Sequence, residues 1–229
     1  MDFNIRNLWV FEIGGVEVWI TETMVATWII MAVLIIFAVV VRLKLKKFSE
    51  VPSGFQNVVE AIIEMFDGFI KDTAGEKLQF LGNWFFMVIM FILISNISGL
   101  FGLRPPTSDW SITFAFAIVT LVLIQVMGFK YRKGEYLKSF FKPFVFFFPI
   151  NVMGELSRPI SLSFRLFGNV LSGVVIMSLI HNLAPIWARF ILPAAIHAYF
   201  DIAVGLIQTY IFCALSLAFI ASAAGAQDD

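Results

Sequence analysis

The chain has 229 residues, of which 60% are hydrophobic and only 14% are charged, and its formal net charge is zero. A soluble domain carries about a quarter charged residues, so this composition is typical of a membrane protein with several spans. The sequence has no basic domain or stripe, which argues against nucleic acid as a partner. The only cysteine, Cys213, cannot form an intrachain disulfide.

Three conventional membrane spans are predicted in the first half of the chain. They follow a short N-terminal segment, residues 1–22, and cover residues 23–41, 80–101 and 112–129. Basic stretches at 42–47 and 130–138 follow the first and third spans, and the positive-inside rule assigns both to the cytoplasm. The N-terminus is therefore expected outside the membrane and the C-terminus in the cytoplasm.

Residues 54–79 have the pattern of an amphipathic helix that is too polar to span the membrane. Apolar residues recur at helical spacing, namely Phe55, Val58, Val59, Ile62, Phe66, Phe69 and Ile70. We expect this helix to lie on the cytoplasmic interface or against a partner helix.

Two apolar stretches, residues 144–180 and 186–224, are too long for ordinary spans. As helices they would approach about 55 Å, against a hydrocarbon core of about 30 Å. Prolines mark possible breaks at Pro149, Pro159, Pro185 and Pro193. We favour two long, steeply tilted helices that form a hairpin. The predicted fold is an all-α polytopic membrane protein, a single domain over 1–229, with about five membrane helices and one interfacial helix.

Arg165 is a permanent charge within the first of these long stretches. An arginine at the centre of a membrane helix costs about 2.5–3.5 kcal/mol on insertion scales. Arg165 is therefore predicted to face a protein partner, an aqueous cavity or an ion path. The alternative is a buried salt bridge with Asp201.

Polar and small residues line one face of each long stretch. The first face holds Arg158, Ser161, Arg165, Asn169, Ser172 and Gly173, and the second holds Asp201, Gly205, Gln208 and Phe212. If the two helices pack antiparallel, Gln208 can hydrogen-bond Arg165, with Asp201 at another depth of the membrane. An arginine cannot relay a proton, but it favours the ionised form of a nearby carboxyl group. The sequence has no second acid beside Arg165, so another subunit is one possible source of that carboxyl group.

These residues carry a resemblance to a known family. The sequence "RPISLSFRLFGNVLSG" followed by "DIAVGLIQTYIFCALSLAFI" resembles subunit a of the F-type ATP synthase membrane sector. The segment "NISGLFGLRPPTSDWSITFAFA" at 96–117 is also similar, and the resemblance runs from about residue 22 to the C-terminus.

The resemblance implies a stator subunit with two offset half-channels that carry ions to and from a rotating c-ring. Arg165 would face the ring and separate the half-channels, so that ions cannot leak straight across. Asn169 matches the amide of the family motif, and Gln208 matches the glutamine of the last helix. The resemblance also implies that the last two helices wrap around the c-ring.

The resemblance also points to acidic residues of the half-channels. Asp201 occupies the family position for a titratable group of the outer half-channel. Val174 stands where many relatives have Glu or His, so Asp201 would supply the acid of this half-channel alone. Glu155 is a weaker candidate for the inner half-channel, and an interfacial, solvated carboxylate is the alternative.

The partners implied are the c-ring, the b subunit of the peripheral stalk, membrane lipid and the translocated H⁺ or Na⁺. No cofactor or metal is expected, and His181 and His197 are given no ligand role. ATP chemistry belongs to another chain, so this subunit is not itself an enzyme. We expect a bacterial plasma membrane, with an organellar or thylakoid membrane as the alternative. The choice between H⁺ and Na⁺ stays open, because the resemblance assigns the ion-binding carboxylate to the c subunit.

Two other functions fit the buried charges. A stand-alone proton or cation antiporter would use Asp201 and Arg165 as its coupling site, but the sequence shows no inverted repeat to match. A structural scaffold would hold Arg165 and Asp201 as a buried pair and would function with both residues neutralised.

Overall fold

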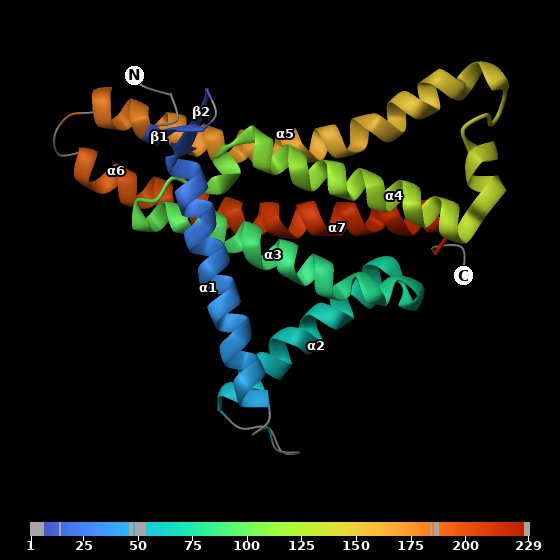
Figure 1. The fold of residues 1–229 in the computed structure, drawn as a ribbon, viewed down its shortest axis with the longest axis horizontal. Coiled ribbons are helices and arrows are strands. Elements are labelled where there is room, and N and C mark those ends of the chain that lie inside the picture. Colours follow the sequence, from blue (N-terminus) through green and yellow to red (C-terminus); the bar gives the residue numbers. More distant parts are fainter. Residues whose placement is uncertain are drawn as a thin grey trace. The chain divides into compact units, whose positions relative to one another are not determined.

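The computed structural model describes residues 7–13, 15–45, 48, 54–183, 185 and 188–226, and Figure 1 labels its elements along the chain. Residues 1–6, the basic residues 46–47 and the predicted start of the last long stretch at 186 lie outside the described residues.

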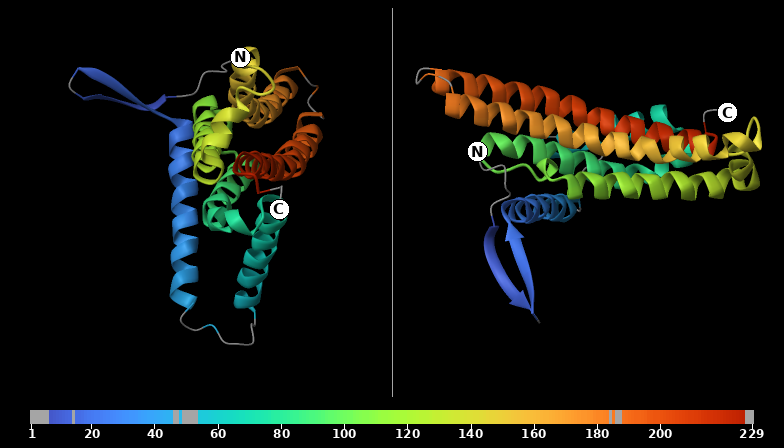
Figure 2. Two further views of the ribbon diagram at one scale, coloured as in Figure 1. Left: turned by 90° about the vertical axis from the view of Figure 1, so that its right-hand side faces the viewer. Right: turned by 90° about the horizontal axis from the view of Figure 1, so that it is seen from above.

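A β-hairpin precedes the first helix and was not predicted. Strands β1 (Asn7–Ile13) and β2 (Val16–Thr21) pair antiparallel, and β2 continues without a linker into α1 (Figure 2). The turn contains Gly15 at φ 83°, a backbone conformation that glycine adopts without steric cost. The rest of the described chain contains helices and short connections.

Five helical stretches among the described residues are long and apolar enough to cross a membrane. They are Glu22–Leu45, Glu76–Phe101, Trp110–Ser139, Val145–Ile180 and Ala195–Ala224. The elements within them are α1 (Glu22–Leu45), η1 (Glu76–Leu81), α3 (Gly82–Ile97), η2 (Ser98–Phe101), α4 (Trp110–Ser139), η4 (Val145–Phe147) and α5 (Phe148–Leu183), then α6 (Ala188–His197), η5 (Ala198–Val204) and α7 (Gly205–Ala224). The all-α polytopic fold class is thereby confirmed.

Helix α2 (Phe55–Ala74) has the predicted amphipathic character. Val59, Phe66 and Ile70 are buried on one face, and the Phe66 ring packs edge-on against Phe86 of α3 with 5.3 Å between ring centroids. The helix ends where Gly75 adopts a φ of 76°. Its apolar face is therefore covered at least partly by the chain's own α3.

Helix α4 runs past the predicted end of the third span. The basic stretch 130–138, expected as a loop, is helical on both sides of a reversal at Lys133, whose φ is 48°. Tyr136 returns onto Gly128, where a Cβ atom would lie 2.7 Å from the tyrosine ring. Gly128 leaves space for the Tyr136 ring, which packs there. The charged residues 130–138 had suggested a loop, but in the structure they are helical on both sides of Lys133.

The two long C-terminal stretches differ in regularity. Helix α5 is continuous with Pro159 inside it, so this proline is not a break, whereas Pro149 stands in the first turn, where proline is tolerated. The predicted helix 186–224 consists of α6, the π-helix η5 and α7. The steep tilt and the wrapping around a partner ring stay predictions.

The described chain forms two compact units, which are described separately. Unit 1 takes its residues from Met1–Phe37, Met90–Thr113 and Phe164–Thr209, and unit 2 from Ala38–Ile89, Phe114–Ser163 and Tyr210–Asp229. Unit 1 has a polar interior with buried Asn96, Thr107 and Gln208, whereas unit 2 has an apolar one that includes Phe85 and Leu217. Unit 1 contains four of the five predicted site residues, namely Arg165, Asn169, Asp201 and Gln208.

Candidate functional site

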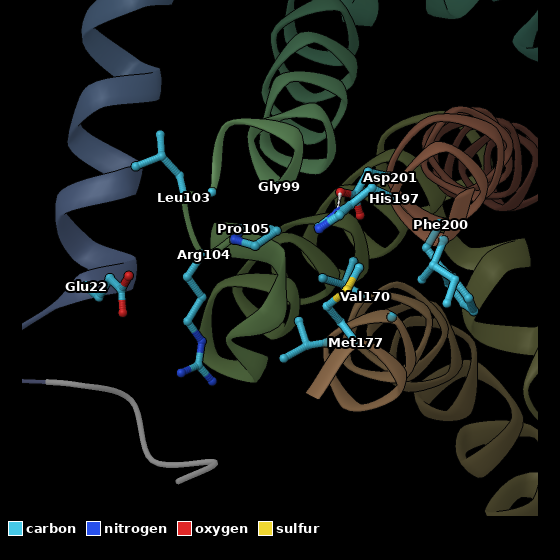
Figure 3. A pocket seen from close by; sticks show the side chains of 14 residues that line it. Glu22, Gly99, Leu103, Arg104, Pro105, Val170, Met177, His197, Phe200 and Asp201 are labelled. Atoms are coloured by element: carbon cyan, nitrogen blue, oxygen red, sulfur yellow. Dashed lines mark hydrogen bonds and ion pairs between the residues drawn. The ribbon is translucent and has the colours of Figure 1, made fainter. Parts of the chain in front are cut away.

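A pocket of about 300 Å³ lies within unit 1. Its lining comes from five parts of that unit: Glu22 of α1, Gly99 of η2, the connection Gly102, Leu103, Arg104 and Pro105, Val170, Gly173, Val174 and Met177 of α5, and Ile196, His197, Phe200 and Asp201 of α6 and η5. Figure 3 shows His197 and Asp201 side by side in this pocket, with Arg104 pointing away from them. The pocket therefore combines an apolar wall from α5 with the ionisable side chains of His197 and Asp201.

Asp201 and His197 form this pair on consecutive helical turns. His197 Nδ1 lies 2.6 Å from Asp201 Oδ2, and the two side chains are 37% and 17% exposed. Asp201 belongs to the π-helix η5, a distortion that occurs frequently at functional sites. The carboxylate also packs against Gly99, where a Cβ atom would lie 2.6 Å from Oδ2.

The contact between His197 and Asp201 was not predicted, and His197 was expected to have no ligand role. Positions four apart on a helix face each other, so the spacing of His197 and Asp201 was a usable signal. Val174, which stands where many relatives have Glu or His, lines the pocket as an apolar residue. Among the described residues, no group of three or more His, Cys, Asp and Glu side chains is placed to hold a metal ion.

Asn169 and Gln208 join α5 to α7. Asn169 Nδ2 donates to Gln208 Oε1 at 2.7 Å, and the Gln208 side chain is buried with its Nε2 unpaired among the described residues. The expected hydrogen bond between Gln208 and Arg165 is absent from the described structure. Asn169 takes that place because it stands one turn further along the same helix.

Arg165 projects out of unit 1. Its side chain is exposed, while the next residue, Leu166, is fully buried. Arg165 has no hydrogen bond or ion pair with any residue that the structure describes. The alternative of a buried Arg165–Asp201 pair is therefore wrong for this conformation, because Asp201 pairs with His197.

A buried polar network fixes the start of α7 beside the pocket. Asn96 of α3 donates from Nδ2 to the Gly205 carbonyl at 3.2 Å and to Thr209 Oγ1 at 3.4 Å. Thr107, in the short helix η3 (Pro106–Ser108), donates to Asn96 Oδ1 at 3.0 Å. Gly205 approaches so closely that a Cβ atom would lie 2.9 Å from the Asn96 Cβ. The network holds the residues just after Asp201 against α3.

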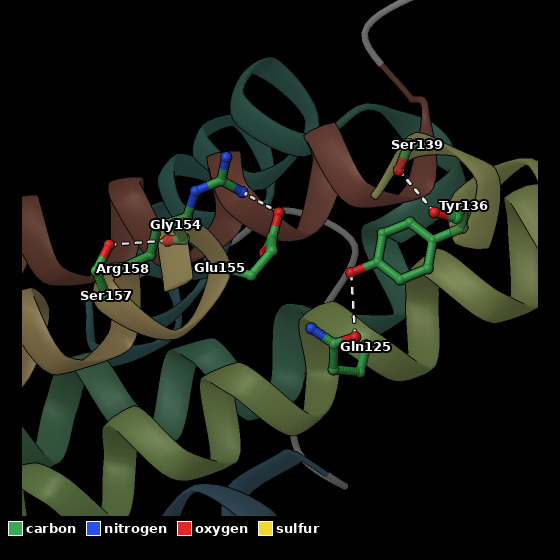
Figure 4. Close-up of polar contacts among 7 residues, drawn as sticks. All are labelled: Gln125, Tyr136, Ser139, Gly154, Glu155, Ser157 and Arg158. Carbon is green, nitrogen blue, oxygen red and sulfur yellow. Dashed lines mark hydrogen bonds and ion pairs between the residues drawn. The ribbon is translucent and has the colours of Figure 1, made fainter. Parts of the chain in front are cut away.

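Glu155 lies in unit 2, beside a second pocket of about 290 Å³ that also includes Gln125. Glu155 Oε1 pairs with the Arg158 guanidinium at 2.7 Å (Figure 4). Its Oε2 is buried and unpaired among the described residues. At the same pocket, the Tyr136 hydroxyl donates to Gln125 Oε1 at 3.2 Å. Glu155 is thus a half-paired carboxylate at a cavity.

Five apolar helices with ionisable and amide groups among them define a polytopic membrane protein that holds charge within its spanning segments. Residues 24–221 match the model of the family described as ATP synthase A chain. The chain therefore belongs to this family, subunit a of the F-type ATP synthase.

Individual relatives agree with the family. The chain is 34% identical over 221 residues to ATP synthase subunit a of Moorella thermoacetica, which covers 96% of this chain and 97% of the relative. It is 36% identical over 222 residues to ATP synthase subunit a 2 of a Bradyrhizobium species, covering 94% and 93%. It is also 33% identical over 231 residues to the sodium ion specific ATP synthase subunit a of Propionigenium modestum, covering 90% and 75%.

Proposed function

We propose that this chain is the ion-channel stator subunit of a rotary ATP synthase. It would provide two offset half-channels that carry H⁺ or Na⁺ to and from a carboxylate on the c-ring, with Arg165 separating them. The observation that carries the proposal is that the Arg165 side chain on α5 is exposed, whereas the next residue, Leu166, is buried. The chain itself would catalyse no ATP chemistry.

The exposed guanidinium needs an anionic partner inside the membrane. An unpaired arginine in lipid costs about 2.5–3.5 kcal/mol or more, and a carboxylate on a facing subunit would offset that cost. The partner must also leave, since a permanent pair would stop rotation. Arg165 cannot give up its proton, so it attracts each arriving carboxylate in the ionised form and blocks direct ion passage.

Asn169 and Gln208 would help to hold Arg165 in its outward direction. Their 2.7 Å hydrogen bond ties α5 to α7 one turn beyond Arg165. The bond fixes the rotation of α5 about its axis, and so the direction in which Arg165 points. The unpaired Gln208 Nε2 is a spare donor near the path of the ion.

The two pockets would belong to the two half-channels. The pocket of Asp201 would open to the outer side, next to the N-terminal end of α1, where Glu22 lines it. The pocket of Glu155 would belong to the inner half-channel, beside the basic end of α4. Both assignments rest on the positive-inside orientation, with the N-terminus outside and the C-terminus in the cytoplasm.

Further partners would follow from this role. The c-ring would face Arg165, a b subunit of the peripheral stalk would anchor the chain against rotation, and lipid would cover the exposed apolar side chains of α1. The long α5 and the α6–α7 segment would lie steeply tilted around the ring. We place the complex in a bacterial plasma membrane, where the organisms of the relatives named above support it.

The decisive experiment replaces Arg165 in the whole complex. Membrane vesicles with Arg165→Ala are compared with wild type for ATP-driven ion pumping and for passive ion leak. We expect coupled pumping to be lost and the leak to rise, because the fixed charge between the half-channels is gone. Arg158→Ala is the matched control on the same helix and should keep pumping. Normal coupled pumping by Arg165→Ala would reduce Arg165 to a structural charge and overturn the proposal.

A further inference from the structure

We propose that His197 is a second proton-carrying group of this pathway, which passes protons between pocket water and Asp201. This inference rests on the proposed function and assigns H⁺, rather than Na⁺, to the pocket of Asp201. His197 is not one of the residues that the family resemblance assigns a role, and the geometry of the pocket supports its role as a proton carrier.

His197 and Asp201 are in direct contact. Nδ1 of His197 and Oδ2 of Asp201 are 2.6 Å apart, a distance at which a proton moves between them without any rearrangement. Both residues lie on adjacent turns of one helical segment, so the contact does not depend on the packing of separate elements. The Asp201 carboxylate lies directly against Gly99, where an added Cβ atom would be 2.6 Å from Oδ2, so glycine leaves room for it.

The side chains of His197 and Asp201 differ in their exposure. The His197 side chain is 37% exposed and that of Asp201 only 17%, and both line the pocket of about 300 Å³. His197 is therefore the member that meets water, and Asp201 is the deeper member. With Nδ1 engaged by the carboxylate, Nε2 is the nitrogen left to exchange protons with water.

The transfer balances without any further reactant. A hydronium ion protonates Nε2, and the imidazolium then donates its Nδ1 proton to Asp201 Oδ2. This leaves a neutral imidazole and a neutral carboxylic acid, which can hand its proton on to the c-ring carboxylate. Water at the exposed ring then moves the remaining proton from Nε2 to Nδ1, which restores the starting tautomer. The reverse sequence releases protons to the outside.

The remaining lining suits a proton better than a sodium ion. A hard cation needs a shell of oxygen ligands, whereas the α5 wall contributes Val170, Gly173, Val174 and Met177, whose side chains offer none. The other charged side chains that line the pocket are Glu22 of α1 and Arg104 of the connection after η2. Arg104 points away from the pair (Figure 3), so His197 is the basic side chain that contacts Asp201 in this pocket.

The test uses the whole complex in inverted membrane vesicles, whose lumen corresponds to the outer side. ATP-driven proton pumping is measured at a fixed external pH while the luminal pH is set between about pH 5 and about pH 8, the range in which histidine changes charge. His197→Gln keeps an amide beside Asp201 but cannot ionise, and Asp201→Asn removes the acid. Co-purification of the complex verifies that each variant assembles.

We expect His197→Gln to lower the pumping rate at least about tenfold and to flatten its dependence on luminal pH, because a positioned acid–base group typically contributes that much or more. Added imidazole should partly restore pumping in His197→Ala, since the pocket then has room for it. Asp201→Asn should pump no better than His197→Gln and should not respond to imidazole.

Three results would overturn the inference. One is wild-type pumping by His197→Gln with an unchanged pH profile. Another is a lower rate with the wild-type pH profile and no rescue, which would make His197 a purely structural neighbour. The third is pumping that requires Na⁺ and ignores His197. In each case, loss of pumping in Arg165→Ala would still support the proposed function. Failure of the His197 inference is therefore distinguishable from failure of the proposed function.

Discussion

Two carboxylates, Asp201 in unit 1 and Glu155 in unit 2, stand in closely similar settings. Each lines a pocket, each side chain is 17% exposed, and each pairs with a basic residue on its own helical segment, at 2.6 Å for His197 and 2.7 Å for Arg158. The two partners differ in one property, since histidine changes charge near neutral pH and arginine does not. Equal burial is therefore compatible with different roles, and under our proposal the basic partner decides whether the carboxylate exchanges protons.

The largest effect is expected from exchanging the partners. His197→Arg should lower ATP-driven pumping about a hundredfold, the scale of a lost acid–base group, because a permanent charge holds the carboxylate ionised and takes no part in proton exchange. The reciprocal variant, Arg158→His, should pump within about twofold of wild type, as expected for a partly exposed ion pair. Pumping rates in vesicles with equal amounts of assembled complex provide the measurement. Similar losses in both variants would erase the distinction between the two pairs.

A middle-sized effect is expected from Gly99→Ala. The added Cβ would lie 2.6 Å from Asp201 Oδ2, so the carboxylate must swing away from His197. A misplacement of about 1 Å at a reacting group can cost up to a hundredfold, and we expect a loss of about tenfold in pumping with normal assembly of the complex. Wild-type pumping would mean that the contact between His197 and Asp201 is not needed.

Two other glycines serve as controls for this variant. Gly205→Ala places its Cβ 2.9 Å from the Asn96 Cβ, which cannot swing aside, so assembly itself should suffer by about 1–3 kcal/mol of overpacking. Gly68→Ala meets no atom within 4 Å and should leave both assembly and pumping unchanged. Thermal dissociation of the purified complex measures the first effect. A normal Gly205→Ala complex would show that the contact with Asn96 is more compliant than its geometry suggests.

The sequence predicted well what depends on long runs and on one helix at a time. The five spans follow from apolar stretches that only a membrane accommodates, and the amphipathic face of α2 follows from spacing along a single helix. Asn169 and Gln208 were both predicted as site residues, and the structure joins them by a hydrogen bond that was not predicted. Asp201 was predicted as a site residue too, but its contact with His197 was not predicted.

The misses arise where two elements, or a departure from regular geometry, decide the outcome. Gln208 was expected to hydrogen-bond Arg165 but accepts from Asn169 instead, because the rotation of α5 against α7 cannot be derived from the spacing within one helix. The π-helix around Asp201 and the reversal at Lys133 depart from regular helix geometry, and nearby side chains, those of Asp201 and Tyr136, lie against Gly99 and Gly128. The N-terminal hairpin alternates only weakly between polar and apolar residues, so its strands had no clear period.

The smallest effect is expected from Glu155→Gln. The change keeps the shape of the side chain, removes the charge and breaks an ion pair whose Arg158 side chain is 38% exposed. We expect pumping to fall about threefold, which corresponds to about 0.7 kcal/mol, with the pH profile unchanged because the arginine beside it does not titrate. Tyr136→Phe is the matched control: it removes the hydrogen bond to Gln125 at the same pocket and leaves the carboxylate, so pumping should not change.

The pumping rate of Glu155→Gln tests the role of the pocket that Glu155 and Gln125 line. A loss as large as that of Asp201→Asn would mean that both carboxylates carry protons and that the identity of the partner is immaterial. No loss at all would return Glu155 to an interfacial, solvated carboxylate and remove it from the inner half-channel. An intermediate loss fits a carboxylate that draws cations toward the path through its buried, unpaired Oε2 without itself exchanging protons, because its charge is already balanced by a partner that never changes.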